Sequence, residues 1–280
     1  MDVEGIDAAM LFPSLALTAM GKEYHADDLA ADVAHAYNDW MAEFCAYSSE
    51  RLLGAGILMP QAIDEAITEV HRVRRELGFK AVVIRPNPVC GRNWHDPAYE
   101  PLWAACEEEE LLVGFHEGIP CLLPHGVAQR FDGRYEDDWM TDHVARHPHE
   151  MQYTILCLVM GGVLERFPGL RVAFLEANCS WVPHWLWRMD EHYEIREKFV
   201  KKLLPEKPST YFKRQCFVSI EADEHTALLA AGVQDTTGVI AVLSVAVSQR
   251  AHEGDLEATL KPIPHRVVVT ESSEEEVALG

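Results

Sequence analysis

Short apolar runs alternate with amphipathic stretches along most of the chain. Each run has about the length of a buried parallel strand, and most are followed by proline, glycine or a polar residue. Seven such runs stand at residues 8–12, 54–58, 81–85, 112–116, 172–176, 216–220 and 239–243. Between them, apolar residues recur at helical spacing over residues 30–45, 64–77, 96–110, 150–167 and 181–193. This alternation predicts an α/β protein of the TIM (β/α)8-barrel type.

A full barrel of this type has eight strands, and only seven runs are visible. Residues 1–7 are helix-like, so the first strand is the simplest one to be missing. We therefore expect a gap between the strands at 8–12 and 239–243, with two exposed sheet edges that oligomerisation could cover. Beyond residue 238 the pattern weakens, which predicts an irregular C-terminal end. No repeat or linker marks a boundary, so residues 1–280 are expected to form a single domain.

Three polar side chains stand where apolar runs end. In barrels of this type, the C-terminal ends of the strands carry the catalytic groups. Arg85, His116 and Glu176 occupy these positions and are expected to point into one cavity at the barrel mouth. Residues 120–147 are rich in charge and histidine and break the alternation. A loop of this length is typical of a functional lid, so it is expected to roof part of the mouth.

Charge and composition narrow the class of protein. The net charge is −21, which argues against binding to nucleic acid, whose phosphates would be repelled. The apolar runs fall well short of the ~20 residues that span a bilayer, so no membrane partner is expected. The seven cysteines form no C-x-x-C pair, which is typical of reduced thiols in a cytoplasmic protein.

Several motifs together resemble one known family. The most specific segments are His147-Pro148-His149-Glu150, residues 161–177 and residues 181–191. Shorter matching segments are Gly5-Ile6-Asp7, Leu11-Phe12-Pro13 and residues 85–88, 95–97 and 116–118. Over residues 1–225 the chain resembles the amidohydrolase-related family. This group of metal-dependent TIM barrels includes aminocarboxymuconate-semialdehyde decarboxylase and γ-resorcylate decarboxylase. Residues 238–280 are atypical of the family, as if read from a shifted frame.

The resemblance implies a divalent metal, zinc or manganese, inside the barrel. His116 matches the family's strand-5 metal ligand, and Glu176 stands where the decarboxylases have a histidine. The family's ligand pair on strand 1 and its aspartate after strand 8 have no counterpart in this sequence. Catalytic zinc uses about three protein ligands, so metal is expected to bind weakly or not at all.

The residues themselves leave alternatives open. Glu176 is either a buried acid that pairs with Arg85, or a general acid/base or outer metal ligand. Arg85 is a candidate for catalysis and for substrate binding. His147, in a cluster with His143 and His149, either binds metal, shapes the start of a helix or contacts substrate. Trp181 is either a packing residue or a substrate contact.

The combined interpretation is a metal-dependent hydrolase or decarboxylase that acts on a small carboxylated or cyclic molecule. The motifs do not choose between the two reactions. The alternative is a catalytically inactive barrel that binds a ligand or serves as a structural subunit. A homo-oligomer is compatible with either interpretation.

Overall fold

Eight parallel strands pair in chain order into a closed barrel, from β1 to β8 and back to β1. The computed structural model describes residues 1–3, 6–21, 27–118, 125–130, 139–221, 224, 226, 242–244 and 267–270. The strands are β1 (Ala8–Leu11), β2 (Leu52–Ile57), β3 (Ala81–Ile84), β4 (Leu112–His116), β5 (Arg171–Leu175), β6 (Cys216–Glu221), β7 (Val242–Ser244) and β8 (Val267–Thr270). The predicted barrel is therefore confirmed.

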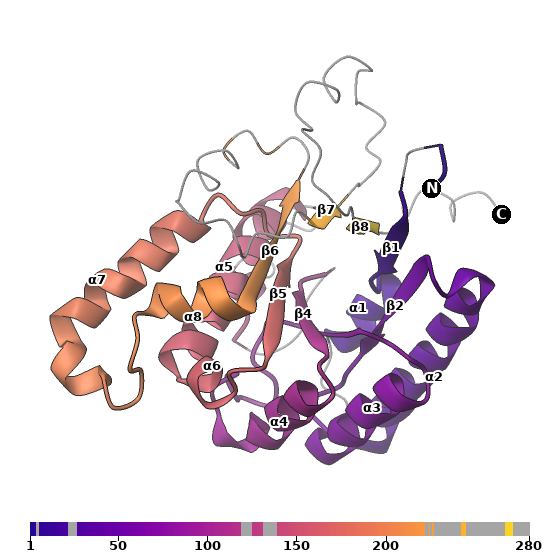
Figure 1. Cartoon of the computed structure of the whole chain (residues 1–280), viewed down its shortest axis with the longest axis horizontal. Coiled ribbons are helices and arrows are strands. Elements are labelled where there is room, and N and C mark those ends of the chain that lie inside the picture. Colours follow the sequence, from indigo (N-terminus) through magenta and orange to yellow (C-terminus); the bar gives the residue numbers. More distant parts are fainter. Residues whose placement is uncertain are drawn as a thin grey trace.

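Helices cover the outside of the strands. The α-helices are α1 (Leu15–Met20), α2 (Asp27–Cys45), α3 (Ile63–Arg75), α4 (Glu100–Glu108), α5 (Trp139–Met160), α6 (Val163–Arg166), α7 (Val182–Val200) and α8 (Pro208–Gln215). Short 3-10 turns lie at Ala46–Ser48, Pro97–Tyr99 and Val127–Arg130. In Figure 1, α2 and α3 lie beside β1 and β2, while α7 and α8 lie on the opposite side, near β5 and β6.

The expected gap beside β1 is wrong. Strand β8 pairs in parallel with β1, from Ala8 opposite Val267 to Leu11 opposite Thr270, and also with β7. It thus fills the place between β1 and β7, and neither edge is left open. Its three valines favour a strand, but no amphipathic helix precedes them in the sequence pattern. Strand β7 also begins three residues later than the predicted run at 239–243.

The predicted loop at 120–147 is partly wrong. Helix α5 already begins at Trp139 and continues through Pro148. Proline usually favours a helix start, because it lacks the N–H that bonds one turn back, and this preference suggested a start near residue 150. Residues 119–124 and 131–138 lie outside the described residues.

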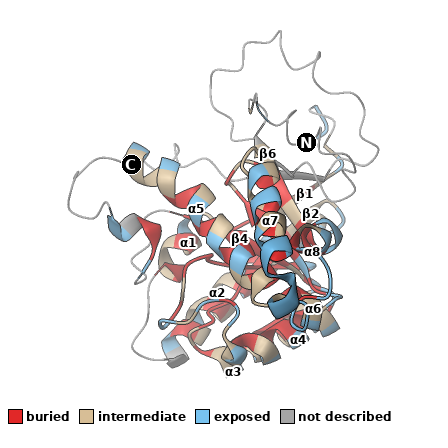
Figure 2. Cartoon of the chain, turned by 90° about the vertical axis from the view of Figure 1, so that its left-hand side faces the viewer, coloured by how far each residue is buried: buried red, intermediate tan, exposed pale blue. Residues whose placement is uncertain are grey.

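Strand alternation divides the core into two layers. Residues that face the barrel interior are on the whole smaller than residues that face the helices. Figure 2 shows that the strands and parts of the surrounding helices are buried. The interior layer includes Ala55, Ile57, Ala81, Val83, Ala173 and Leu175. The outer layer includes Val82, Ile84, Val113, Phe115, Val172 and Phe174. Small interior residues allow the strands to close into a narrow barrel.

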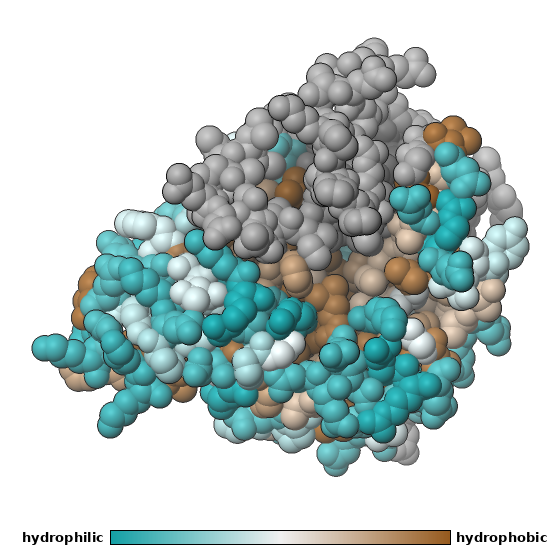
Figure 3. Space-filling view, viewed as in Figure 1, coloured by the Kyte–Doolittle hydropathy of each residue, from teal (hydrophilic) through white to brown (hydrophobic). Residues whose placement is uncertain are grey.

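Part of the described surface is largely hydrophilic. Figure 3 shows this over α7 and α8. Among the described helices, none combines the length and the apolar character needed to cross a bilayer.

One buried side chain completes the hydrogen bonds of β2. Strand β1 ends at Leu11, opposite Gly54, so the backbone of Ile57 has no partner in β1. Asn38 of α2 takes this place: its Oδ1 accepts from Ile57 N at 2.7 Å, and its Nδ2 donates to Ile57 O at 3.0 Å. The same Nδ2 donates to Glu69 Oε1 of α3 at 2.6 Å. Asn38 therefore fastens two helices to the end of one strand.

We predict that Asn38→Ala lowers the free energy of unfolding by about 2–4 kcal/mol, because it leaves the buried N–H and C=O of Ile57 unpaired. Urea unfolding followed by circular dichroism measures the change. Thr68→Ala, which removes an exposed hydrogen bond of 3.0 Å to Asp64 O, is the control and should change the value by less than about 0.5 kcal/mol. Equal effects of the two substitutions would contradict the role assigned to Asn38.

Candidate functional site

Arg85 and His116 both face the barrel interior at the ends of their strands. Arg85 follows β3 and has the same parity as the interior residues Ala81 and Val83, and His116 ends β4 with the parity of Gly114. At Gly114, a Cβ would lie 3.0 Å from Cδ1 of Leu175, an interior residue of the neighbouring strand β5. The side chain of His116 is 3% exposed, and its ring centroid lies 6.3 Å from that of Phe12. Strand geometry alone thus brings both side chains to the mouth.

Glu117 is the buried acid that pairs with Arg85. Its Oε1 accepts from Arg85 Nη2 at 2.9 Å and from Arg146 Nη1 of α5 at 3.2 Å. All three side chains are at most 1% exposed. Burial raises the pKa of Glu117, and the positive charges of Arg85, Arg146 and His116 oppose this. We call Arg85, Glu117 and Arg146 the buried ion triad.

The guanidinium of Arg85 has further partners. Its Nη2 also donates to Gly118 O at 3.3 Å, and its Nη1 donates to Leu17 O at 3.3 Å. Residue 118 must be glycine for this approach, since a Cβ would lie 2.5 Å from Arg85 Nη1. The side chain of Arg85 is thus buried and is not exposed at the surface of the barrel mouth.

Glu176 lies directly after β5 in a left-handed backbone conformation, with φ of 57°. Its N–H donates to Ser219 Oγ of β6 at 2.8 Å, and its carbonyl accepts from His147 Nδ1 at 2.7 Å. The side chain of Glu176 is 27% exposed. Left-handed residues other than glycine are often found at functional sites, where the surrounding structure holds them in place.

The carboxylate of Glu176 lies between two buried histidines. Its Oε2 is 3.9 Å from His116 Nδ1 and 3.6 Å from His147 Nδ1. Each Nδ1 also contacts a backbone carbonyl, of Glu117 and Glu176 respectively, so each Nδ1 carries the hydrogen. Burial, together with His143 and Arg146, holds the pKa of His147 well below its usual range. His147 is therefore neutral, with its lone pair on Nε2, which is buried and has no hydrogen-bond partner among the residues that the structure describes.

The structure thus brings His116, Glu176 and His147 together, whereas Arg85 belongs to the buried ion triad. The suggested pairing of Glu176 with Arg85 is wrong, because Glu117 occupies that guanidinium. Sequence reasoning missed Glu117, Arg146 and Ser219. The only signal for Glu117 was its position directly after the strand-end histidine.

Trp181 lies apart from this group of three. Its Nε1 donates to Ala177 O at 2.8 Å and to Asn178 O at 3.0 Å, so the indole fastens the connection between β5 and α7. Its ring packs against the outer apolar layer. These contacts match the packing interpretation, and contact with substrate stays a prediction.

The described residues do not form a complete metal site. Within that part of the chain, no group of three or more histidine, cysteine, aspartate or glutamate side chains could hold a metal ion. His116 and Glu176 offer one nitrogen and one carboxylate, whereas catalytic zinc takes about three protein ligands. We therefore derive no chemical step through a metal.

Comparison of the sequence with known protein families identifies the family of this chain. The sequence matches the amidohydrolase family over residues 2–233. The chain belongs to the amidohydrolase family. The resemblance read from the motifs is thereby confirmed.

Curated relatives of this amidohydrolase are decarboxylases. It is 28% identical over 195 residues to 2-amino-3-carboxymuconate-6-semialdehyde decarboxylase of Dictyostelium discoideum, covering 70% of this chain and 51% of the relative. It is 29% identical over 169 residues to γ-resorcylate decarboxylase of Rhodococcus jostii, covering 58% and 49%. The chain thus spans about half the length of the curated relatives it matches.

Solved structures share the fold. The 5-carboxyvanillate decarboxylase of Sphingomonas paucimobilis superposes with a TM-score of 0.69 at 22% identity, covering 88% of this chain and 71% of the other. A dihydroxybenzoic acid decarboxylase of Polaromonas, solved with manganese and the inhibitor 2-nitroresorcinol, gives 0.65 at 21% identity, covering 86% and 71%. At sequence identities this low, the structural similarity shows only that the proteins share the barrel fold.

Glu150, one turn beyond His147 on α5, is a second buried acid near the mouth. It is 2% exposed, and its Oε1 accepts from Val127 N. Burial raises the pKa of Glu150 from 4.5 to about 7, although the hydrogen bond from Val127 opposes the shift. The folded protein therefore binds this proton more tightly than the unfolded chain does.

We predict that this acid makes the protein less stable as the pH rises. Its contribution is fully present below pH 4.5 and is lost as the pH passes about 7. Glu150→Gln keeps an acceptor for Val127 and cannot ionise. Relative to the native protein, the variant should therefore gain up to about 3 kcal/mol of unfolding free energy between pH 5 and pH 8. Urea titrations across this range measure the gain, and parallel pH profiles of the two proteins would refute the assignment.

Proposed function

We propose that this amidohydrolase is a decarboxylase that acts on small aromatic carboxylic acids. The observation that carries the proposal is the group of Glu176 and two histidines at the mouth of a barrel whose curated relatives are decarboxylases. Hydrolysis, the other reaction open from sequence, is not the reaction named for these relatives.

The reaction sets two requirements. The bond between the ring carbon and the carboxyl carbon breaks, its electron pair stays on the ring carbon, and carbon dioxide leaves. That ring carbon must then receive a proton. The site therefore has to orient a carboxylate and to hold an acid close to the ring.

Glu176 is the best placed proton carrier. It is the member of the group whose side chain is partly exposed, whereas the side chains of His116 and His147 are each 3% exposed. Its backbone is held from both sides, by Ser219 and by His147. In this proposal the Nδ1–H groups of His116 and His147 orient the carboxyl group of Glu176, and Arg85 acts through Glu117 as a positioning residue.

We predict that Glu176→Gln lowers the rate of carbon dioxide release by about a hundredfold or more, because general acid catalysis contributes ~10²–10⁴ to a rate. The assay uses substituted hydroxybenzoates with manganese or zinc added. Glu191→Gln on α7 is the matched control and should retain the native rate.

Unchanged turnover in Glu176→Gln would exclude it as the proton carrier. Absence of turnover by the native chain on every hydroxybenzoate would contradict the decarboxylase proposal. The inactive-barrel alternative would then be the better explanation.

A further inference from the structure

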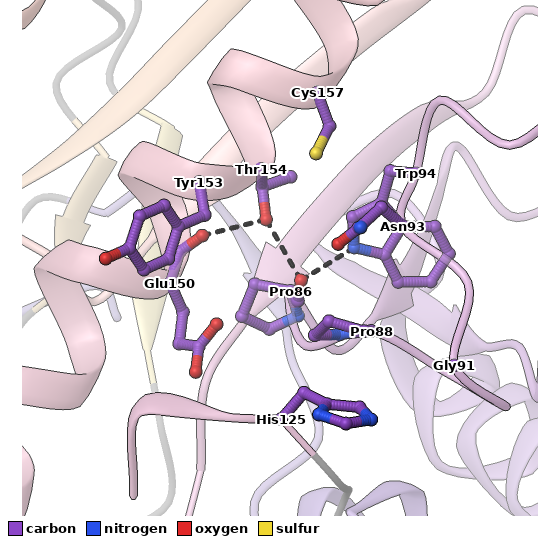
Figure 4. Close-up of a pocket in the computed structure, with 10 residues that line it drawn as sticks. All are labelled: Pro86, Pro88, Gly91, Asn93, Trp94, His125, Glu150, Tyr153, Thr154 and Cys157. Carbon is purple, nitrogen blue, oxygen red and sulfur yellow. Dashed lines mark hydrogen bonds between the residues drawn. The ribbon is translucent and has the colours of Figure 1, made fainter. Parts of the chain in front are cut away.

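A cavity of about 180 Å³ lies between the segment that follows β3 and one face of α5. Figure 4 shows its walls: Pro86, Pro88 and Trp94 on one side, and side chains of α5 on the other. The helix contributes Glu150, Tyr153, Thr154 and Cys157, whose spacing places them on one face. His116, Glu176 and His147 are not among the lining residues, so this cavity is separate from the site described above.

The walls are fixed without a ligand. Pro86 O accepts from Trp94 Nε1 at 2.6 Å and from Thr154 Oγ1 at 3.0 Å, so the carbonyl joins the loop to the helix. Trp94 is 1% exposed and packs edge-on against Trp103 and Phe115. A preformed cavity of this kind costs little ordering when a ligand binds.

The size of the cavity suits one small ring. A cavity of roughly 150 Å³ is known to hold benzene. Among the lining residues, Pro88, Tyr153 and Cys157 have accessible surface that such a ring could contact. Drug-sized ligands need roughly 300 Å³ or more, which this cavity does not offer.

The polar residues that line the cavity favour an uncharged ligand over an anionic one. Among the described lining residues there is no lysine or arginine, and the basic residue His125 is exposed. A carboxylate inside the cavity would be buried without a matching cation, which is costly. The carboxyl group of Glu150 instead suits a hydroxyl donor. We propose that this cavity binds an uncharged single-ring phenol, with the hydroxyl on Glu150 and the ring against Pro88 and Cys157.

This inference does not rest on the proposed reaction, because binding is measured directly. Isothermal titration of the full chain at pH 8 with phenol and with benzoate compares the two ring types. Phenol should bind saturably and at least about tenfold more tightly than benzoate. Benzoate binds more weakly because its carboxylate would lose its hydration on entering the cavity. Benzoate that binds as tightly as phenol would overturn the proposal.

Two variants locate the bound ring. Cys157→Leu fills the cavity and should weaken phenol binding at least about tenfold, and Cys157→Met is the substitute if that variant does not fold. Glu150→Gln replaces a charged acceptor by a neutral one and should weaken binding about fivefold. The control is Glu43→Gln on the exposed face of α2, which should bind as the native chain does. Unchanged phenol affinity in the folded Cys157 and Glu150 variants would show that phenol binds elsewhere.

Discussion

The barrel mouth depends on a single buried carboxylate. Glu117 follows β4 directly and receives hydrogen bonds from Arg85 after β3 and from Arg146 on α5. A carboxylate without solvent contact must be paired, and Glu117 pairs with two guanidiniums that are themselves buried. Arg146 has a second carboxylate nearby, since its Nε lies 3.0 Å from Asp142 Oδ2. The pairing of Glu117 therefore joins two strand ends and the helix that carries His147. Next to this ion triad, His116 Nδ1 and Glu176 Oε2 lie 3.9 Å apart.

Helix α5 connects the two functional regions. One of its turns presents His147 to Glu176 at the barrel mouth, and the next presents Glu150 to the cavity beside β3. Both side chains are buried and both have a shifted pKa because of that burial, in directions that favour the neutral form. The helix thus carries two neutral polar groups into a region where ionised groups without partners would be costly.

Much of the fold could be predicted from the sequence, because a buried parallel strand leaves a continuous apolar run. Strand β4 is the best case, since the predicted residues 112–116 are the strand observed. Strand β8 could not be predicted in the same way, because its four residues stand without a helical pattern before them. The positions of Arg85 and His116 follow from strand parity. The partner of Arg85 does not, because Arg146 comes from a helix 29 residues after Glu117 and no local pattern links them. The left-handed backbone of Glu176 is equally hidden, since glycine is the residue that usually signals it.

The most direct test of this account is the unfolding free energy of Glu117→Leu beside Glu117→Gln. The leucine leaves Arg85 buried without a carboxylate and leaves Arg146 with Asp142 alone, and we expect a loss of about 3–5 kcal/mol. The glutamine keeps one acceptor oxygen at the same place and should cost clearly less. Losses within about 1 kcal/mol of the native value for both variants would show that the barrel mouth does not depend on the buried ion triad.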